Sequence, residues 1–234
     1  MPSRNSPLRT ADVARESGYS VQQIRNLERD GVLPEVRRAG NGYRRYAAEH
    51  VRAARAYRAL AAAVGPVEAK TIIRAPAGEL LERLDAAHAG LHTERRDLRL
   101  AREAVSAIAA EPIGDPRPAD AMSISELAEA LGVRPSALRH WEAEGLLEPC
   151  RTGGRPAGER RSYTPADVRD ARVVHQLRLA GYRIGQIKAV LPQLRQDGFR
   201  EETLAARDAS IAARSRALMR ATAELDGVLA ARAV

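Results

Sequence analysis

Several residue types that characterise other classes of protein are scarce in this chain of 234 residues. Cys150 is its single cysteine, so one chain can form neither a disulfide framework nor a cysteine-based zinc or iron–sulfur site. Aromatic residues make up 3%, which excludes a stacking platform for single-stranded nucleic acid. The sequence contains no signal peptide and no apolar run of about 18 residues, so we expect a cytoplasmic protein without a membrane partner.

Lysine is also nearly absent, since Lys70 and Lys188 are the only lysines and arginine supplies the other basic residues. The net charge of +8 favours an anionic partner. This charge is uneven, because residues 1–76 carry 14 basic against 7 acidic side chains, whereas residues 120–199 carry 12 against 10. We therefore expect the first of these segments to hold the phosphates of a nucleic acid more tightly.

The chain does contain a repeat. Leu8–Val36 reads LRTADVARESGYSVQQIRNLERDGVLPEV, and Met122–Cys150 reads MSISELAEALGVRPSALRHWEAEGLLEPC, at a constant offset of 114 residues. Each copy is predicted to form two short helices that are joined through a glycine, Gly18 or Gly132. Such a helix-turn-helix presents the N-terminal end of its second helix to the major groove of DNA. A duplicated unit of this kind suggests a duplicated target, and palindromic DNA is the obvious candidate.

A basic segment follows each pair of helices. In the first copy, Arg37–Tyr46 contains Asn41-Gly42 between basic and aromatic residues, which is a hairpin signal. In the second copy, the segment from Arg151 to Tyr163 is three residues longer and richer in glycine. Arginine and tyrosine side chains on a small hairpin are suited to donating hydrogen bonds to phosphate oxygens.

Together with this hairpin, Leu138–Leu146 (LRHWEAEGL) and Ile24–Val32 (IRNLERDGV) resemble the MerR family of bacterial transcription regulators. The resemblance covers both copies and almost the whole chain. It implies a mainly α fold with two winged helix-turn-helix domains, each followed by a helix pair and a long coiled-coil helix that pairs antiparallel with a partner. It also implies binding to promoter DNA in a bacterial cytoplasm, with RNA polymerase as an indirect partner.

Two heptad patterns support the long helices. The apolar positions are Leu80, Leu84, Leu91, Leu98 and Val105 in the first pattern and Leu204, Ile211, Leu218 and Leu225 in the second. Polar residues such as Glu94 and Asp208 interrupt the other seam position. Four to five heptads are long enough for a credible coiled coil of about 45 Å.

The partner of each long helix decides the assembly. If the two helices pair antiparallel within one chain, the end of the first lies about 10 Å from the start of the second. The Pro-rich connector, residues 111–121, spans at most about 36 Å and covers that gap. We therefore favour an intramolecular pseudo-dimer, in which one chain does the work of two subunits. A homodimer with four winged domains is the alternative.

These patterns predict five segments. They are residues 1–76 and 122–197 as winged-helix DNA-binding domains, 77–110 and 198–234 as coiled-coil helices, and 111–121 as the linker. The residues that we expect to contact DNA phosphates are Arg25, Arg37, Tyr43, Arg44, Tyr46, Arg139, Arg151, Arg160, Arg161 and Tyr163. Those that we expect to face base edges are Ser20, Gln22 and Gln23 in the first copy and Arg134 and Ser136 in the second.

The two copies are not equivalent. Glutamine pairs bidentately with adenine and arginine with guanine, so the two recognition helices favour different bases. In the wings, Tyr43 of the first copy corresponds to Arg160 of the second. We therefore expect an imperfect inverted repeat as the target, with one half-site richer in A·T and the other in G·C.

Two other functions remain open at this stage. A small-molecule sensor would need a pocket between the coiled-coil helices and the winged domains, and a homodimer with four heads would bridge DNA as an architectural protein. His88 and His92 lie four residues apart but lack a third ligand, so we expect no metal site. We also expect no enzyme activity and no cofactor, because no carboxylate pair, nucleophile–base set or phosphate-binding loop is present.

Overall fold

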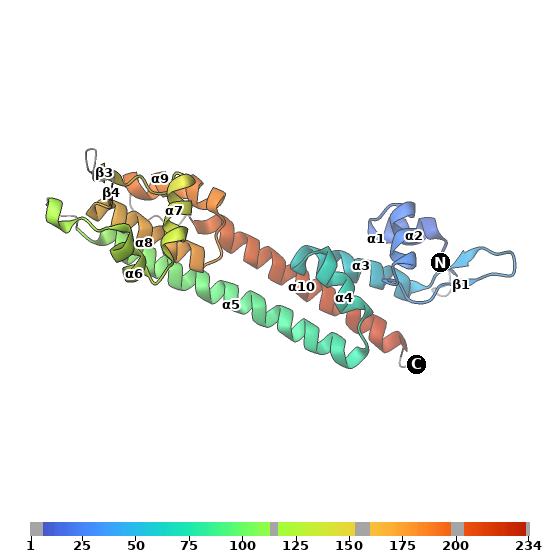
Figure 1. Ribbon diagram of the computed structural model, residues 1–234. Coiled ribbons are helices and arrows are strands. Elements are labelled where there is room, and N and C mark those ends of the chain that lie inside the picture. Colours follow the sequence, from blue (N-terminus) through green and yellow to red (C-terminus); the bar gives the residue numbers. More distant parts are fainter. Residues whose placement is uncertain (1–6, 113–116, 153–159, 198–203, 233–234) are drawn as a thin grey trace. The chain divides into compact units, whose positions relative to one another are not determined.

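The computed structural model describes residues 7–112, 117–152, 160–197 and 204–232. Within these ranges the chain is mainly α-helical, as predicted, and the strands form two antiparallel hairpins (Figure 1). The helices are α1 (Thr10–Ser17), α2 (Val21–Arg29), α3 (Ala48–Val64), α4 (Pro66–Arg74), α5 (Ala77–Ala110), α6 (Ile124–Leu131), α7 (Pro135–Ala143), α8 (Pro165–Leu179), α9 (Ile184–Asp197) and α10 (Ala205–Arg232), with a 3₁₀ turn at Pro118–Asp120. The strands are β1 (Arg37–Arg38), β2 (Arg44–Arg45), β3 (Cys150–Thr152) and β4 (Arg160–Ser162).

In the first copy, α1 and α2 form the predicted helix-turn-helix. Gly18 ends α1 with a φ of 73°, a left-handed conformation that a residue with a Cβ rarely adopts. The hairpin of β1 and β2 follows, with Arg38 opposite Arg44. Two backbone hydrogen bonds of 2.8 and 3.0 Å join Leu8 to Tyr46 and tie the end of this wing to the chain before α1.

The second copy repeats this arrangement. Gly132 ends α6 with a φ of 65°, and Pro135 occupies the first turn of α7, where its missing N–H costs no hydrogen bond. Strands β3 and β4 pair as the second wing, and backbone hydrogen bonds of 2.9 and 2.8 Å join Met122 to Tyr163. The glycine-rich tip, residues 153–159, lies outside the described residues.

The two lysines of the chain hold equivalent positions. The Lys70 ammonium group on α4 lies 2.6 Å from the Asp30 carboxylate, which follows α2 directly. In the second copy the Lys188 ammonium group on α9 lies 3.6 Å from the carboxylate of Glu144, which follows α7. Each ion pair therefore links the C-terminal end of a recognition helix to the helix pair that follows the wing in the sequence. The Lys70 ammonium holds the pKa of Asp30 below its usual range.

The chain divides into two compact units, each of which is discontinuous with respect to the long helices. The first unit combines Met1–His92 with Ser210–Val234, and the second is Thr93–Ala209. Each unit thus contains one winged domain together with parts of both long helices, α5 and α10. The physical reason is burial, since the apolar seam of each long helix needs cover along its whole length.

The predicted seam residues of both long helices are covered by neighbouring parts of the chain. All nine predicted seam residues are buried, with exposed fractions of 5% or less: Leu80, Leu84, Leu91, Leu98, Val105, Leu204, Ile211, Leu218 and Leu225. In the second unit, the polar interruptions of the seams are paired with arginines of the opposite helix. Arg207 donates to Glu94 at 2.9 Å, and Arg102 lies 3.9 Å from Asp208.

Within the second unit, α5 contacts the start of α10. Arg207 of α10 donates to Glu94 of α5, and Arg102 of α5 donates to the carbonyl of Leu204, the residue before α10, at 3.4 Å. The Arg172 side chain of α8 also forms a two-pronged ion pair with Glu111, the residue after α5. The end of α5, which follows the first copy, is therefore attached to the winged domain of the second copy.

The first unit shows the reciprocal exchange. Arg214 of α10 donates to the Ala63 carbonyl of α3 at 2.7 Å. Arg52 of α3 donates to the Gly227 carbonyl of α10 at 3.0 Å and lies directly against that glycine. Thus α10, which follows the second copy, packs on a helix of the first copy.

Candidate nucleic-acid interface

The first recognition helix, α2, presents a polar face at its N-terminal end. Ser20 caps the helix by accepting from the Gln23 N–H at 3.1 Å, and the Gln23 side-chain oxygen accepts from the Ser20 N–H at 2.8 Å. Gln22 donates to Asn26 at 3.2 Å along the same face. Ser20, Gln22 and Gln23 are exposed, but the Gln23 side-chain oxygen is already held by the Ser20 N–H.

The second recognition helix, α7, has a different N-terminal end. Arg134 is the N-cap residue, and its side chain makes no capping hydrogen bond. Arg134, Ser136 and Arg139 are all exposed, whereas Leu138 and Trp141 are buried and anchor the helix. This end therefore offers two arginines and a serine, where the first copy offers a serine, two glutamines and Arg25.

In the first copy, one carboxylate joins the wing to the recognition helix. The Arg44 Nε on β2 donates to both carboxylate oxygens of Glu28 on α2, at 2.8 and 3.0 Å. The Tyr46 hydroxyl donates to the same carboxylate at 3.0 Å. The hydrogen bonds and the charge of Glu28 raise the pKa of Arg44, so this guanidinium stays charged. Its two terminal amino groups remain available for a phosphate.

The second copy repeats this cluster. Arg161 Nε donates to Glu142 at 2.8 Å, and the Tyr163 hydroxyl donates to the other carboxylate oxygen. The hydrogen bond and charge of Glu142 raise the pKa of Arg161, and burial followed by the same carboxylate raises that of Tyr163. Glu28 and Glu142 were not predicted as site residues, although a signal exists. Each copy has Glu, Arg and Tyr in the same order, and the spacings differ only by the three extra residues of the second wing.

The position of two tyrosines corrects the sequence prediction. Tyr46 and Tyr163 were expected to reach phosphates, but they are 1% and 0% exposed. Their hydroxyls donate to the carboxylates of Glu28 and Glu142, which lie on the recognition helices. The pKa of Tyr46 is raised, mainly by burial. These tyrosines therefore position the wing and do not face the solvent.

A basic groove of about 760 Å³ lies between the first wing and the helices beside it. Three predicted residues line it together, namely Arg25, Tyr43 and Arg44. Arg9 and Arg45, which were not predicted, line it as well. Tyr43 is 74% exposed at the wing tip. The groove thus offers four guanidinium groups and an exposed aromatic ring, which suits a sugar–phosphate backbone.

The remaining predicted residues are placed less completely. Arg37 is exposed on β1, opposite Arg45 in the register of the hairpin. Arg151 and Arg160 lie on β3 and β4, but their side chains are outside the described part of the structure. Cys150 is exposed at the start of β3. Among the described residues, no group of three or more potential metal ligands occurs, and no helix is long and apolar enough to cross a membrane.

An exposed recognition helix, a two-stranded wing and a basic groove between them define a winged helix-turn-helix DNA-binding protein. Comparison with family models identifies the kind: residues 9–46 match the MerR family regulatory protein model, and residues 122–194 match the MerR HTH family regulatory protein model. The chain is thus a MerR-family, DNA-binding transcription regulator with two MerR-type units in tandem. No curated protein and no solved structure matches it.

Proposed function

We propose that a single chain reads a pseudo-palindromic promoter element with two non-identical heads, as an intramolecular pseudo-dimer. The observation that carries this proposal is the reciprocal exchange of long helices. In the second unit Glu111 at the end of α5 pairs with Arg172 of α8, and in the first unit Arg52 of α3 binds the Gly227 carbonyl of α10. Each winged domain therefore packs on the long helix of the other copy, and one chain supplies both partners.

The two heads, which are the two winged domains, differ in the hydrogen-bonding groups that they present to a base pair. The first presents the Gln22 amide, whose side-chain oxygen and second N–H match the N6 and N7 edge of adenine. The second presents Arg134, whose guanidinium matches the O6 and N7 edge of guanine. Arg25, Arg44 and Arg45 in the groove of the first head would bind phosphates and fix its register on the duplex. RNA polymerase would be affected indirectly, through the shape that the bound chain imposes on the promoter.

The test is selection of bound sequences from a random pool of duplexes with the intact chain. The proposal predicts an inverted repeat with one A·T-richer and one G·C-richer half-site. A matched variant, Gln22→Ala, should relax selection in the first half-site only, while Ser136→Ala should affect only the second. A perfect palindrome, or relaxation of both half-sites by one substitution, would contradict reading by two different heads.

A further inference from the structure

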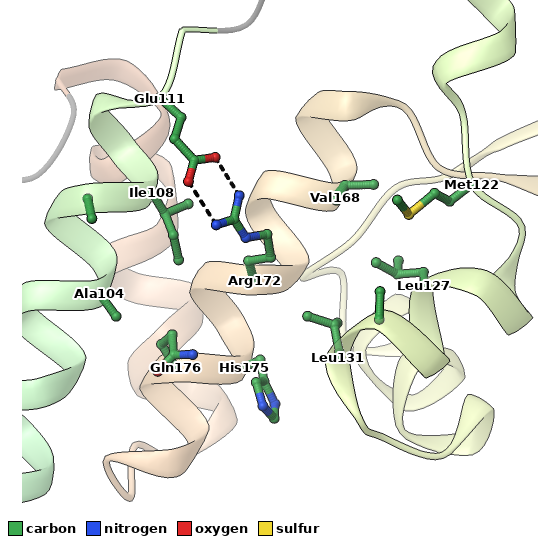
Figure 2. A pocket seen from close by; sticks show the side chains of 12 residues that line it. Ala104, Ile108, Glu111, Met122, Leu127, Leu131, Val168, Arg172, His175 and Gln176 are labelled. Carbon is green, nitrogen blue, oxygen red and sulfur yellow. Dashed lines mark hydrogen bonds and ion pairs between the residues drawn. The ribbon is translucent and has the colours of Figure 1, made fainter.

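The second unit contains a cavity of about 630 Å³ that is not part of the DNA interface (Figure 2). Its walls come from the end of α5, from α6 and from α8, and they are mostly aliphatic. The apolar wall residues are Ala104, Ala107, Ile108, Met122, Leu127, Ala130, Leu131 and Val168. Cavities of this size and character commonly hold small molecules in proteins.

The polar side chains of the cavity are few and carry no net charge. Arg172 and Glu111 neutralise each other through their two-pronged ion pair, which Figure 2 shows at the edge of the lining residues. Burial lowers the pKa of His175, so its ring is neutral at pH 7. No hydrogen-bond partner for the His175 or Gln176 side chain occurs among the described residues. The cavity thus offers two unengaged, uncharged hydrogen-bonding groups on α8.

The first copy provides an internal comparison, because residues after the wing correspond at an offset of 117. Arg172 corresponds to Arg55, and His175 corresponds to Arg58. Arg55 donates to the Glu16 carbonyl at 3.0 and 2.8 Å, and Arg58 donates to the Gly18 carbonyl at 3.0 Å. These two arginines therefore cover the end of α1 and fill the space that is open in the second copy.

The neighbouring glycines confirm the difference. A Cβ at Gly18 would collide with the Arg58 guanidinium, whereas a Cβ at the equivalent Gly132 would meet no atom within 4 Å. The smaller pocket beside Arg55 and Arg58 has a volume of about 330 Å³. The long helices also differ between the two places. When α5 and α10 are aligned so that Leu98 matches Leu218, Ala104 of the cavity corresponds to Glu224. The Glu224 carboxylate lies 3.9 Å from the Arg55 guanidinium.

From this comparison we propose that the cavity of the second unit binds a small, uncharged, largely apolar molecule that carries a hydroxyl or carbonyl group for His175 and Gln176. The absence of net charge at the site argues against an ionic ligand, since a charged group would lose its hydration without gaining an unpaired partner. At the equivalent place in the first copy, Arg55 and Arg58 bind the end of α1, and the pocket beside them is smaller and lined by charged side chains. Use of the ligand as a regulatory signal rests on the proposed function, whereas binding itself does not.

A single tryptophan makes the site accessible to experiment. Trp141 is the only tryptophan of the chain, and its ring lies 6.5 Å from the His175 ring, centroid to centroid. Titration of the full chain with the neutral dye N-phenyl-1-naphthylamine, without DNA, should quench Trp141 by energy transfer and saturate at one dye per chain. Loss of DNA binding would leave this result unchanged, so the two proposals fail separately.

Filling the cavity should block the dye. Ala107→Phe on α5 and Ala130→Phe on α6 enter it from opposite walls, and each should weaken binding at least roughly tenfold. Ala62→Phe is the matched control, because Ala62 lines the small pocket of the first unit. Circular dichroism would identify folded variants. Absence of saturable quenching, or unchanged affinity in both folded cavity variants, would overturn the proposal, as would equal weakening by Ala62→Phe.

Discussion

The Arg44 guanidinium on the first wing donates through one nitrogen, Nε, to both carboxylate oxygens of Glu28 on the recognition helix, at 2.8 and 3.0 Å. The second copy pairs Arg161 with Glu142 in the same manner, at 2.8 Å. This geometry leaves the terminal amino groups of each arginine free for a phosphate. It also joins the wing to the recognition helix, so the side chains that we propose for base and phosphate contacts are held in one preset arrangement.

Glu28→Gln should therefore weaken DNA binding although it removes a negative charge. The neutral amide cannot hold Arg44 with charge-assisted hydrogen bonds, and we expect an affinity loss of about tenfold. Glu16→Gln is the control, because it removes the same charge from an exposed position on α1. It should leave affinity unchanged or raise it slightly. Gel-shift titrations of both variants measure the difference, and equal behaviour would show that the ion pair does not position the wing.

Phosphate contacts of the first head should contribute more to DNA affinity than those of the second. Arg44→Ala and Arg161→Ala remove equivalent side chains, but residues 1–76 carry the larger excess of basic residues. We expect Arg44→Ala to cost more affinity. Each lost contact should reduce the slope of log affinity against log salt by about one unit. Titrations over a range of salt concentrations measure both quantities, and equal losses would show that net charge does not identify the anchoring head.

Local patterns made much of the fold predictable. Leucines repeated every seven residues identify a buried stripe on α5, and Asn41-Gly42 between basic residues identifies the first wing. Both depend on neighbours in the sequence. Which helix covers the stripe is a matter of distant contacts, and the heptads left an intramolecular pseudo-dimer and a homodimer as alternatives.

The candidate site was less predictable for the same reason. A tyrosine at the end of a wing can face phosphate or the interior, and Tyr46 is buried with its hydroxyl donating to Glu28, 18 residues earlier. A pocket between the coiled-coil helices and the winged domains was left open as an alternative, but its place could not be predicted because the cavity of the second unit depends on the direction that one arginine side chain takes. Arg55 binds the end of α1, whereas Arg172 at the equivalent position binds Glu111.

Leu98→Ala should destabilise the chain strongly, because Leu98 is 1% exposed in the seam of α5. A buried leucine truncated to alanine typically costs about 2–5 kcal/mol in the free energy of unfolding. Leu100→Ala is the matched control on the same helix, where Leu100 is 52% exposed, and it should change stability by no more than about 0.5 kcal/mol. Urea unfolding followed by circular dichroism compares them. Similar effects from both would contradict a packed seam at Leu98.

The central claim is that one chain supplies both halves of the pseudo-dimer. Light scattering coupled to gel filtration measures the mass of the free chain and of its complex with a selected duplex. We predict the mass of one chain, 25.4 kDa, at micromolar concentration and on tenfold dilution, and one chain per duplex in the complex. A stable mass of two chains that persists on dilution, or two chains on each duplex, would contradict the pseudo-dimer and favour the four-headed assembly.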